Sequence, residues 1–141
     1  MTDNSLKIKA EIQEKIAIML EEIGQRAVGH ARENAPVGTP ESTGIENYHG
    51  GMLRQSLTYK VIGNTVYIGT NLTSNKAPYP IFVEYGTGIF AINGRKTPWV
   101  WTDKNGKRHY THGIKPTHFL RNAIDDNKSE YINVIRKYFN D

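Results

Sequence analysis

Apolar residues recur every three or four positions through the first 35 residues, and this spacing predicts one long amphipathic helix. The stripe consists of Ile8, Ile12, Ile16, Met19, Leu20, Ile23, Ala27 and Ala31. Asp3, Asn4 and Ser5 offer side-chain oxygens for an N-cap, and Pro36 prevents the helix from continuing past Ala35. About 30 residues make a helix on the order of 45 Å long. We expect its excess length to pack along the full width of a sheet or against a neighbouring subunit.

The centre of the chain has the alternation of a β-hairpin. Residues 53–62 and 65–70 alternate well enough for two strands, and Gly63 and Asn64 supply the turn between them. The preceding residues 37–51 are rich in Gly, Pro, Ser and Thr and contain little that could be buried. We therefore expect 37–51 to be a mobile loop that becomes ordered only on contact with a partner.

Two further patterns complete the predicted elements. Pro78 and Pro80 begin a short segment in which Ile81, Phe82 and Tyr85 have near-helical spacing, closed by Gly86. Residues 99–102 and 108–111 flank an Asn-Gly turn, which is typical of a second hairpin. From about Thr117 a last helix is predicted, with a weak point at 125–129 and an apolar stripe of Phe119, Leu120, Ala123, Ile124, Tyr131, Ile132, Ile135 and Phe139.

This order predicts an α+β fold in one domain spanning 1–141, in which the long N-terminal helix and the C-terminal helix pack on an antiparallel sheet with a protruding β-hairpin. We expect the core to join the two helical stripes to the short central helix. Its predicted members are Ile12, Ile16, Leu20, Ile23, Phe82, Phe119, Leu120 and Ile124.

The net charge of +4 is concentrated in one segment, because residues 95–115 hold six basic groups and one acid. This distribution favours a local basic patch over a field around the whole domain. The chain has no cysteine, which excludes disulfides and Cys-based zinc sites. With neither an apolar leader nor a membrane-length run, we expect a soluble protein working in a cytoplasm, without membrane partners.

The basic segment coincides with the second hairpin, 95–112, and interleaves charged and aromatic residues. Its candidate contact residues are Arg95, Lys96, Trp99, Trp101, Lys107, Arg108 and Tyr110. Trp, Tyr and Arg are enriched at protein interfaces, so we favour an interface that becomes ordered or buried only when subunits or partners assemble. A second interpretation places the aromatics on one face for packing and the lysines on the other for solubility. The third is nucleic-acid binding by base stacking and phosphate contacts.

The candidates for chemistry lack the companions that catalysis needs. His109 and His112 lie three apart near a strand end without an acid between them, so we expect His109, His112 and His118 to be structural and predict no metal or cofactor. Glu84 stands alone among apolar residues; it could be a general acid, but we favour an ion pair or helix-end hydrogen bond with Arg54 or Arg121. Ser56 and Thr87 lie in neither a nucleophile elbow nor a phosphate-binding loop, so we predict no enzyme activity.

Four phrases along the chain resemble a phage virion family, the tail-completion or head–tail joining proteins of long-tailed phages. Its members typically have Ala-Pro-Val after the first helix, Thr-Gly-x-Leu-Arg-x-Ser, Tyr-x-x-x-Val-Glu-hydrophobic-Gly-Thr, and Pro-x-x-Phe-Leu-Arg-x-Ala. In this chain they are Ala35-Pro36-Val37, Gly51-Met52-Leu53-Arg54-Gln55-Ser56, Tyr79-Pro80-Ile81-Phe82-Val83-Glu84-Tyr85-Gly86-Thr87 and Pro116-Thr117-His118-Phe119-Leu120-Arg121-Asn122-Ala123. Two departures are visible: eleven residues separate Thr39 from Gly51, and the Trp-rich hairpin enlarges the segment before Pro116.

The resemblance implies a non-enzymatic structural protein of the phage or prophage neck. It implies a self-assembled ring, six-fold in relatives, that joins the head connector or completion protein to the tail terminator or tube protein. The expected location is the virion, and the host bacterial cytoplasm during assembly. The alternative is a small basic nucleic-acid-binding module, and a small enzyme such as a nuclease comes third.

Overall fold

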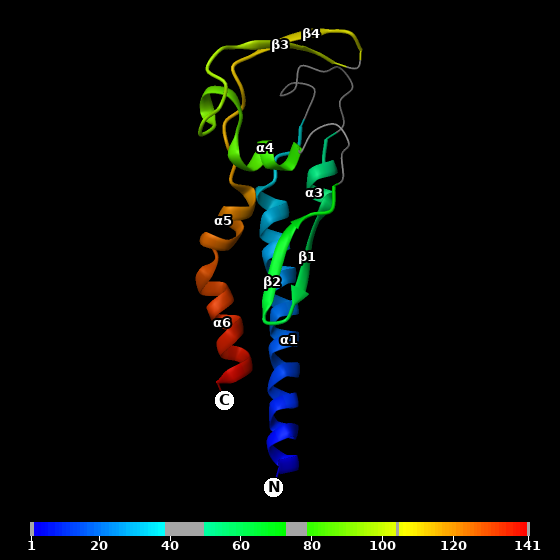
Figure 1. The fold of residues 1–141 in the computed structure, drawn as a ribbon, viewed down its shortest axis with the longest axis vertical. Coiled ribbons are helices and arrows are strands. Elements are labelled where there is room, and N and C mark those ends of the chain that lie inside the picture. The colour runs from blue at the N-terminus through cyan, green and yellow to red at the C-terminus, as the bar shows by residue number, and fades with distance from the viewer. Residues whose placement is uncertain (1, 39–49, 73–78, 104, 141) are drawn as a thin grey trace.

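The computed structural model describes residues 2–38, 50–72, 79–103 and 105–140, and one long helix forms its axis. Helix α1 (Thr2–Asn34) runs along the long axis of the molecule from the end that holds the N-terminus, and the remaining elements lie beside its C-terminal half or beyond it (Figure 1). The helix begins before the predicted cap residues Asp3, Asn4 and Ser5, which lie inside it. At its other end Ala35 still donates to the carbonyl of Ala31, and Pro36 ends the helix as predicted.

The first hairpin packs along α1. Strands β1 (Leu57–Ile62) and β2 (Thr65–Thr70) pair antiparallel, with Ile62 opposite Thr65 and Leu57 opposite Thr70. The ring of Tyr59 lies so close to Gly24 of α1 that a Cβ there would be 2.7 Å from the Tyr59 Cγ. A side chain at position 24 would therefore push the sheet away from the helix.

The prediction of a strand over 53–62 is wrong for residues 53–56. Residues Met52–Ser56 form a helical turn, α3, and only Leu57 begins the strand. Leu53 and Ser56 are both buried, and a spacing of three places two residues on one face of a helix but on opposite faces of a strand. Gly51, with φ 103°, makes the reversal that starts this turn, a conformation that glycine adopts readily.

The buried side chains form two clusters along α1, which differ from the predicted single core. One cluster joins α1 to α3, β1, the helix α4 (Tyr79–Tyr85) and the helix α5 (Phe119–Asp125); it contains Val28, Ala31, Ala35, Leu53, Leu57, Val83, Phe119 and Ala123, with Leu120 packed against it. The other joins Met19 and Leu20 to Val134 of α6 (Lys128–Phe139), with Ile16 and Ile23 packed against it.

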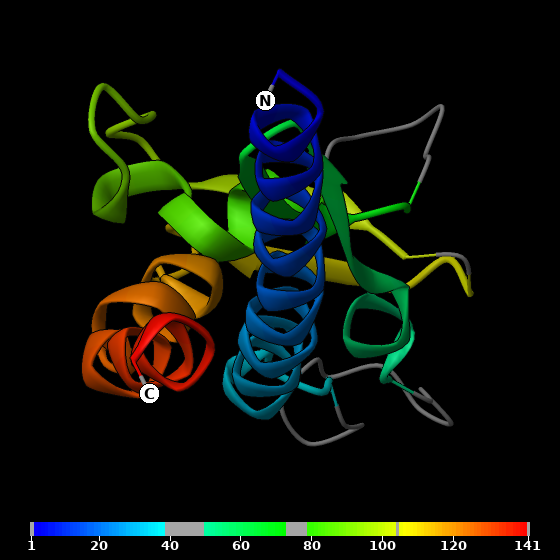
Figure 2. The ribbon, with the colours of Figure 1, turned by 90° about the horizontal axis from the view of Figure 1, so that it is seen from below.

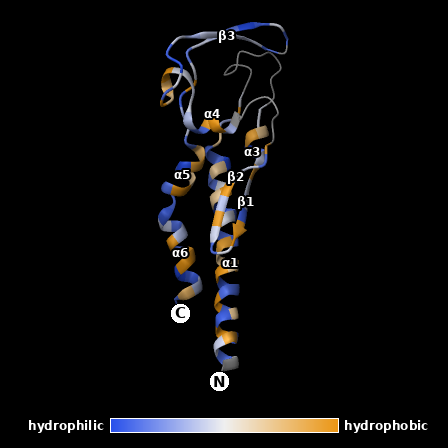
Figure 3. Cartoon of the chain, viewed as in Figure 1, coloured by the Kyte–Doolittle hydropathy of each residue, from blue (hydrophilic) through white to orange (hydrophobic). Residues whose placement is uncertain are grey.

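Three residues predicted for the core are exposed, namely Ile12, Phe82 and Ile124. The N-terminal part of α1 extends beyond β1, β2 and α6 (Figure 1), and in the view from below it lies nearest to the viewer (Figure 2). Ile12 of this helix is 46% exposed. On α4 Pro80, Val83 and Glu84 are buried, whereas Phe82 is 39% exposed. Orange apolar bands continue along α1 beyond the covered part (Figure 3), which shows that the stripe extends further than its partners.

The C-terminal helix is broken where the sequence is weak, as predicted. Helix α5 ends at Asp125 and α6 starts at Lys128. The break is held by the side chains of Asn127 and Tyr131, which both donate to the carbonyl of Ala123. Because the break changes the helical phase, Val134 becomes the buried residue of α6, while Ile132, Ile135 and Phe139 of the predicted stripe are exposed.

The second hairpin is a separate two-stranded sheet. Strands β3 (Trp99–Thr102) and β4 (Arg108–Thr111) pair as predicted and lie at the end of the molecule opposite the N-terminus (Figure 1). A short 3-10 turn, Gly88–Phe90, precedes them. The two strands pair with each other within one chain. That the hairpin becomes ordered or buried only on assembly stays a prediction.

Candidate functional site

The two longest motif phrases, 79–87 and 116–123, meet in one junction. The backbone N–H and the hydroxyl of Thr117 both donate to the carbonyl of Val83, at 3.0 and 2.9 Å. The N–H of His118 donates to the carbonyl of Glu84 at 3.1 Å. On the other side, the N–H of Thr87 donates to the carbonyl of Ile114 at 2.9 Å. Segments some thirty residues apart in sequence are thus joined by main-chain hydrogen bonds into one unit.

Glu84 has a structural place in this junction. Its side chain is buried, and its two oxygens accept the N–H groups of Leu120 at 2.9 Å and Arg121 at 3.2 Å. These amides belong to the first turn of α5, where N–H groups lack helical partners and an acidic group is favoured. The predicted helix-end hydrogen bond therefore forms, through the backbone of Arg121. His118 Nδ1 lies 3.9 Å from a Glu84 oxygen and has no hydrogen-bond partner within the described chain.

The glycine of the Gly-Thr phrase is required by close packing. Gly86 has φ 77°, and a Cβ on it would lie 2.8 Å from the carbonyl oxygen of Ile114 and 2.9 Å from the Pro116 ring. The residue thus meets both conditions that favour glycine: a left-handed backbone and a neighbour too close for a side chain. His118, with φ 50°, takes the same left-handed region just before α5. These two residues turn the chain so that Phe119 enters the core.

The split motif around the 37–51 loop is rejoined in space. Arg54 does not pair with Glu84; its guanidinium donates to the carbonyl of Ala35 at 2.9 Å, at the C-terminal end of α1. Nearby, the backbone of Gly50 packs against that of Gly38 so closely that no Cβ fits between them. Residues 39–49, the centre of the predicted mobile loop, lie outside the described residues. The two halves of the phrase, up to Gly38 and from Gly50, are therefore neighbours.

The motif residues are thus gathered in one region, whereas the hairpin residues are apart from it. Leu53, Val83, Phe119, Gly86 and Glu84 are buried, Thr87, Pro116 and Leu120 are half-buried, Arg54 and Arg121 are exposed, and Tyr79 begins α4. The candidate interface residues Arg95, Lys96, Lys107, Arg108, Trp101 and Tyr110 are exposed on or before the hairpin, and Trp99 is half-buried.

The hairpin divides its aromatic residues between two faces. Trp99 lies opposite Thr111 and Trp101 opposite His109, so these residues share one face. Tyr110 lies opposite Val100 and points to the other face, together with Arg108. Trp101 stacks on the His109 ring at 4.4 Å, and the Arg95 guanidinium lies 5.5 Å from the centre of the Trp99 ring. The side chains on the face of Trp99 and Trp101 therefore contact neighbouring residues of the chain. The face of Arg108 and Tyr110 is exposed, and we call it the open face.

Asp103 organises the tip of the hairpin. One of its oxygens accepts the N–H groups of Asn105 and Lys107, at 2.8 and 2.9 Å, and the other lies 2.8 Å from His109 Nε2. The hydrogen bond with His109, followed by the two backbone N–H groups, lowers the pKa of the Asp103 carboxyl. His109 has the structural role that the sequence predicted.

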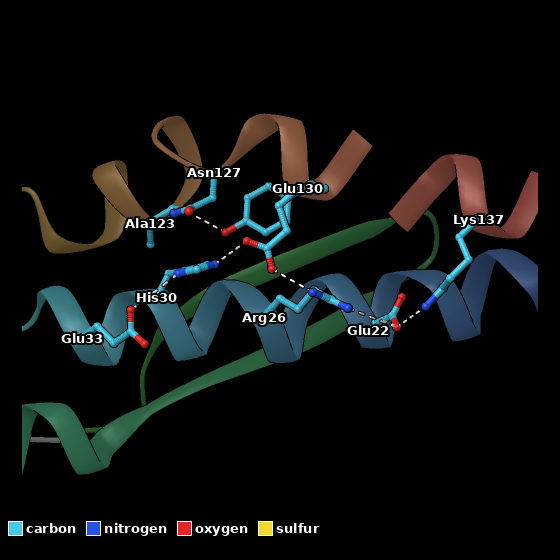
Figure 4. Close-up of polar contacts among 9 residues, drawn as sticks. Glu22, Arg26, His30, Glu33, Ala123, Asn127, Glu130 and Lys137 are labelled. Atoms are coloured by element: carbon cyan, nitrogen blue, oxygen red, sulfur yellow. Dashed lines mark hydrogen bonds and ion pairs between the residues drawn. The ribbon is translucent and has the colours of Figure 1, made fainter. Parts of the chain in front are cut away.

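A polar ladder between α1 and α6 was not predicted (Figure 4). Glu130 of α6 contacts Arg26 at 2.8 Å and His30 at 2.6 Å, and Lys137 pairs with Glu22. The Arg26 hydrogen bond, then that of His30, lowers the pKa of the Glu130 carboxyl. A signal was present in the sequence: Glu22, Arg26 and His30 recur every four residues on one helix face. The ladder positions α6 on α1.

The described ranges contain neither of two features that would suggest other functions. No group of three or more His, Asp or Glu side chains there is arranged to hold a metal ion. No described helix is both long enough and apolar enough to span a bilayer. The exposed or half-buried histidines contact aromatic rings or carboxylates, such as Tyr110 beside His112 and Tyr85 beside His118.

Comparison with known proteins gives no relative. No family model, no curated protein and no solved structure matches this chain.

Proposed function

We propose that this protein is a structural component of a phage or prophage particle, located at the neck. In this proposal it assembles as a homo-oligomeric ring, six-fold as the resemblance implies, between the head connector or completion protein and the tail terminator or tube protein. It would occupy the virion, and the host bacterial cytoplasm during assembly. The proposal rests on the resemblance of four sequence phrases, and one observation supports it most: those phrases, scattered between residues 35 and 123, come together around Phe119 and Glu84.

This convergence supports the proposal because it gives the residues of each phrase a role in packing or hydrogen bonding. Leu53 and Val83 pack in the cluster around Phe119, Arg54 closes the end of α1, and Gly86 permits the junction with Pro116. A chance likeness over short phrases has no reason to place them in mutual contact. The eleven residues between Thr39 and Gly51 separate two halves of a phrase in sequence, yet Gly38 and Gly50 are in contact.

We assign the ring contacts to the hairpin. Its open face carries Val100 and Tyr110, which are 46% and 65% exposed, beside Arg108. Large aromatic and Arg side chains at the centre of a contact, with lysines at its rim, are the composition of interface hot spots. The pairing of β3 with β4 fixes which side chains share this face, which lowers the entropy cost of ordering them in a contact.

The test is a double variant on the open face, Val100→Ala with Tyr110→Ala, placed in the phage or prophage that encodes the chain. We expect separate heads and tails by electron microscopy, while circular dichroism of the purified variant shows a folded chain. Ile135→Ala is the matched control, since Ile135 is an exposed apolar residue on α6, at a distance from the hairpin. Normal infectious particles from the double variant would contradict the interface assignment.

A nucleic-acid-binding function is the second candidate, and one observation favours it. Arg108 and Tyr110 share the open face of the hairpin, where a phosphate contact and a stacking ring could act together. Fluorescence anisotropy with a single-stranded DNA oligonucleotide tests this at several salt concentrations. Micromolar binding that weakens steeply with salt and is lost in Arg108→Ala would favour this function over the ring.

The proposal includes no catalytic role. Glu84 is engaged by two backbone amides, and its neighbour His118 is 3.9 Å away. Stoichiometric zinc or manganese in protein purified without added metal, or hydrolytic activity lost on replacing Glu84, would contradict this part of the proposal.

A further inference from the structure

A groove of about 320 Å³ lies between β2, α4 and α5, and Glu84 is among the residues that line it. Its walls are mainly apolar and are built by Ile68, Pro80, Ile81, Leu120 and Ile124, with Arg121 among the lining residues. Ile81 and Ile124 are 54% and 45% exposed, and Tyr85 beside them is 55% exposed. This concentration of large exposed apolar side chains around a hollow is typical of a binding surface.

The strand that forms one wall has an unpaired edge. Asn71 donates to the carbonyl of Ser56, which continues the pairing of β1 and β2 and fixes its alternation. Residues 65, 67 and 69 therefore direct their backbone groups toward β1, and Val66, Ile68 and Thr70 direct theirs outward. Within the described chain no hydrogen bond reaches these outward N–H and C=O groups. In Figure 1, β1 and α5 lie on opposite sides of β2, so this edge faces the side of the groove.

The outer edge of β1 differs from that of β2, because a side chain donates to one of its carbonyls. The carbonyl of Leu57 points outward from β1 and accepts a hydrogen bond from the Arg32 guanidinium at 3.0 Å. Among the residues that the structure describes, no side chain donates to an outward carbonyl of β2 in this way. An exposed strand edge is a template for a further strand unless it is blocked, and β2 lacks the blocking devices of a charged or proline residue on the edge.

Two details define what the groove accepts. Gly69 lines the groove, and a Cβ added to it would meet no atom within 4 Å, so the described chain leaves the space beside this residue open. The Arg121 side chain is exposed and has no ion pair among the described residues, because Glu84 contacts the Arg121 backbone and not its guanidinium. The groove thus offers backbone hydrogen bonds, apolar walls and one free positive charge.

We propose that this groove binds an extended segment of a partner protein, which adds to β2 as a third strand. The segment places apolar side chains at alternate positions against Ile68, Leu120 and Ile124, and a carboxylate against Arg121. Strand addition derives affinity from main-chain hydrogen bonds and specificity from pockets for alternate side chains. A helix would fill the apolar hollow but would leave the outward amides of Ile68 and Thr70 unpaired.

The charge on the groove argues against a second copy of this chain as the occupant. None of the four described strands of this chain contains Asp or Glu, and β1 and β4 carry Lys60 and Arg108. Bringing these cations to Arg121 would be repulsive. The occupant is therefore a different chain with an acidic group on its strand.

The test uses a short fluorescein-labelled peptide that alternates valine with threonine and ends in glutamate. We expect saturable anisotropy change with the purified full chain, together with slower amide exchange at Ile68 and Thr70 by NMR. Gly69→Glu should weaken binding by about tenfold or more, because it adds to the groove a carboxylate that repels the one on the peptide. Gly29→Glu is the matched control, since a Cβ at Gly29 of α1 also meets nothing within 4 Å.

Two further peptides separate the contribution of the carboxylate to binding from that of the main-chain hydrogen bonds. Replacing the terminal glutamate of the peptide by glutamine should weaken binding to the wild type severalfold but leave binding to Arg121→Gln unchanged. A peptide N-methylated at alternate amides should bind at least about tenfold more weakly, because it cannot donate to the strand edge.

Four results would overturn the proposal. They are absence of binding at millimolar peptide, equal binding of the N-methylated peptide, equal binding by Gly69→Glu, and protection of the Ile68 and Thr70 amides that grows with protein concentration alone. The last would identify a second copy as the occupant. The groove shares no residue with the hairpin, so failure here leaves the proposed neck function untouched, and the hairpin variants leave the groove intact.

Discussion

Phe119→Ala is the change that tests the fold most directly. Phe119 is the first residue of α5 and its side chain is fully buried, with an exposed fraction of 0%. Burying a large apolar side chain contributes about 1.5–3 kcal/mol by transfer alone, and its truncation adds the free energy of the cavity left behind. Phe→Ala in a protein core typically costs about 3–5 kcal/mol.

The surroundings of Phe119 place the expected cost in the upper part of that range. Three of its neighbours in the cluster are Ala31, Ala35 and Ala123, each at most 1% exposed. Alanines offer no long side chain that could move into the cavity, and they hold helix backbones in place. Because the site cannot collapse, we expect a loss of about 4–5 kcal/mol in the free energy of unfolding.

Chemical denaturation with urea, followed by circular dichroism, measures the effect as a shift of the midpoint at unchanged slope. Phe139→Ala is the matched control, because it removes the same side chain from a site that is 45% exposed on α6. We expect that control to cost about 1 kcal/mol or less. A cost below about 2 kcal/mol for Phe119→Ala, or equal costs for the two variants, would refute the placement of Phe119 in the core.

Three other predictions follow from particular contacts. Glu84→Ala should destabilise the chain by about 2–4 kcal/mol, since it leaves two amides of α5 without their acceptor, and Glu84→Gln should cost less; urea unfolding distinguishes them. Gly29→Ala should stabilise α1 by about 0.5–1 kcal/mol, whereas Gly24→Ala should destabilise the protein because its Cβ meets the Tyr59 ring. In thermal unfolding the melting temperature should rise for Gly29→Ala and fall for Gly24→Ala, and shifts of equal sign would contradict the packing. Because the folded state lowers the pKa of Glu130, its stabilisation of α6 is complete above the ordinary value of 4.5 and is lost as pH falls below it; NMR of Tyr131 during acid titration should show release of α6, and Glu130→Gln should abolish this pH dependence.

The sequence by itself determined the elements whose signals are local. The long first helix, both hairpin turns, the short helix ended by Gly86 and the break near 125–129 all follow from spacing, glycine and proline, because these act on the backbone within a few residues. The same locality explains the error at 53–56, where an apolar spacing of three was too short to distinguish one helical turn from a strand. The positive charge of the hairpin was also predictable from the sequence, since it depends only on which residues the segment contains.

Only the tertiary structure decided which apolar residues are buried and what the polar ones contact. Ile12 and Ile16 have the same spacing on the same helix face, yet only Ile16 has a neighbour in the second cluster, because burial depends on how far α6 and the sheet extend. The roles of Glu84, Arg54 and Gly86 depend on partners that are nineteen to thirty-seven residues away in sequence. The free edge of β2 likewise exists only after β1 has paired with its other side. Such contacts have no signature in spacing, since they arise when separately formed elements pack.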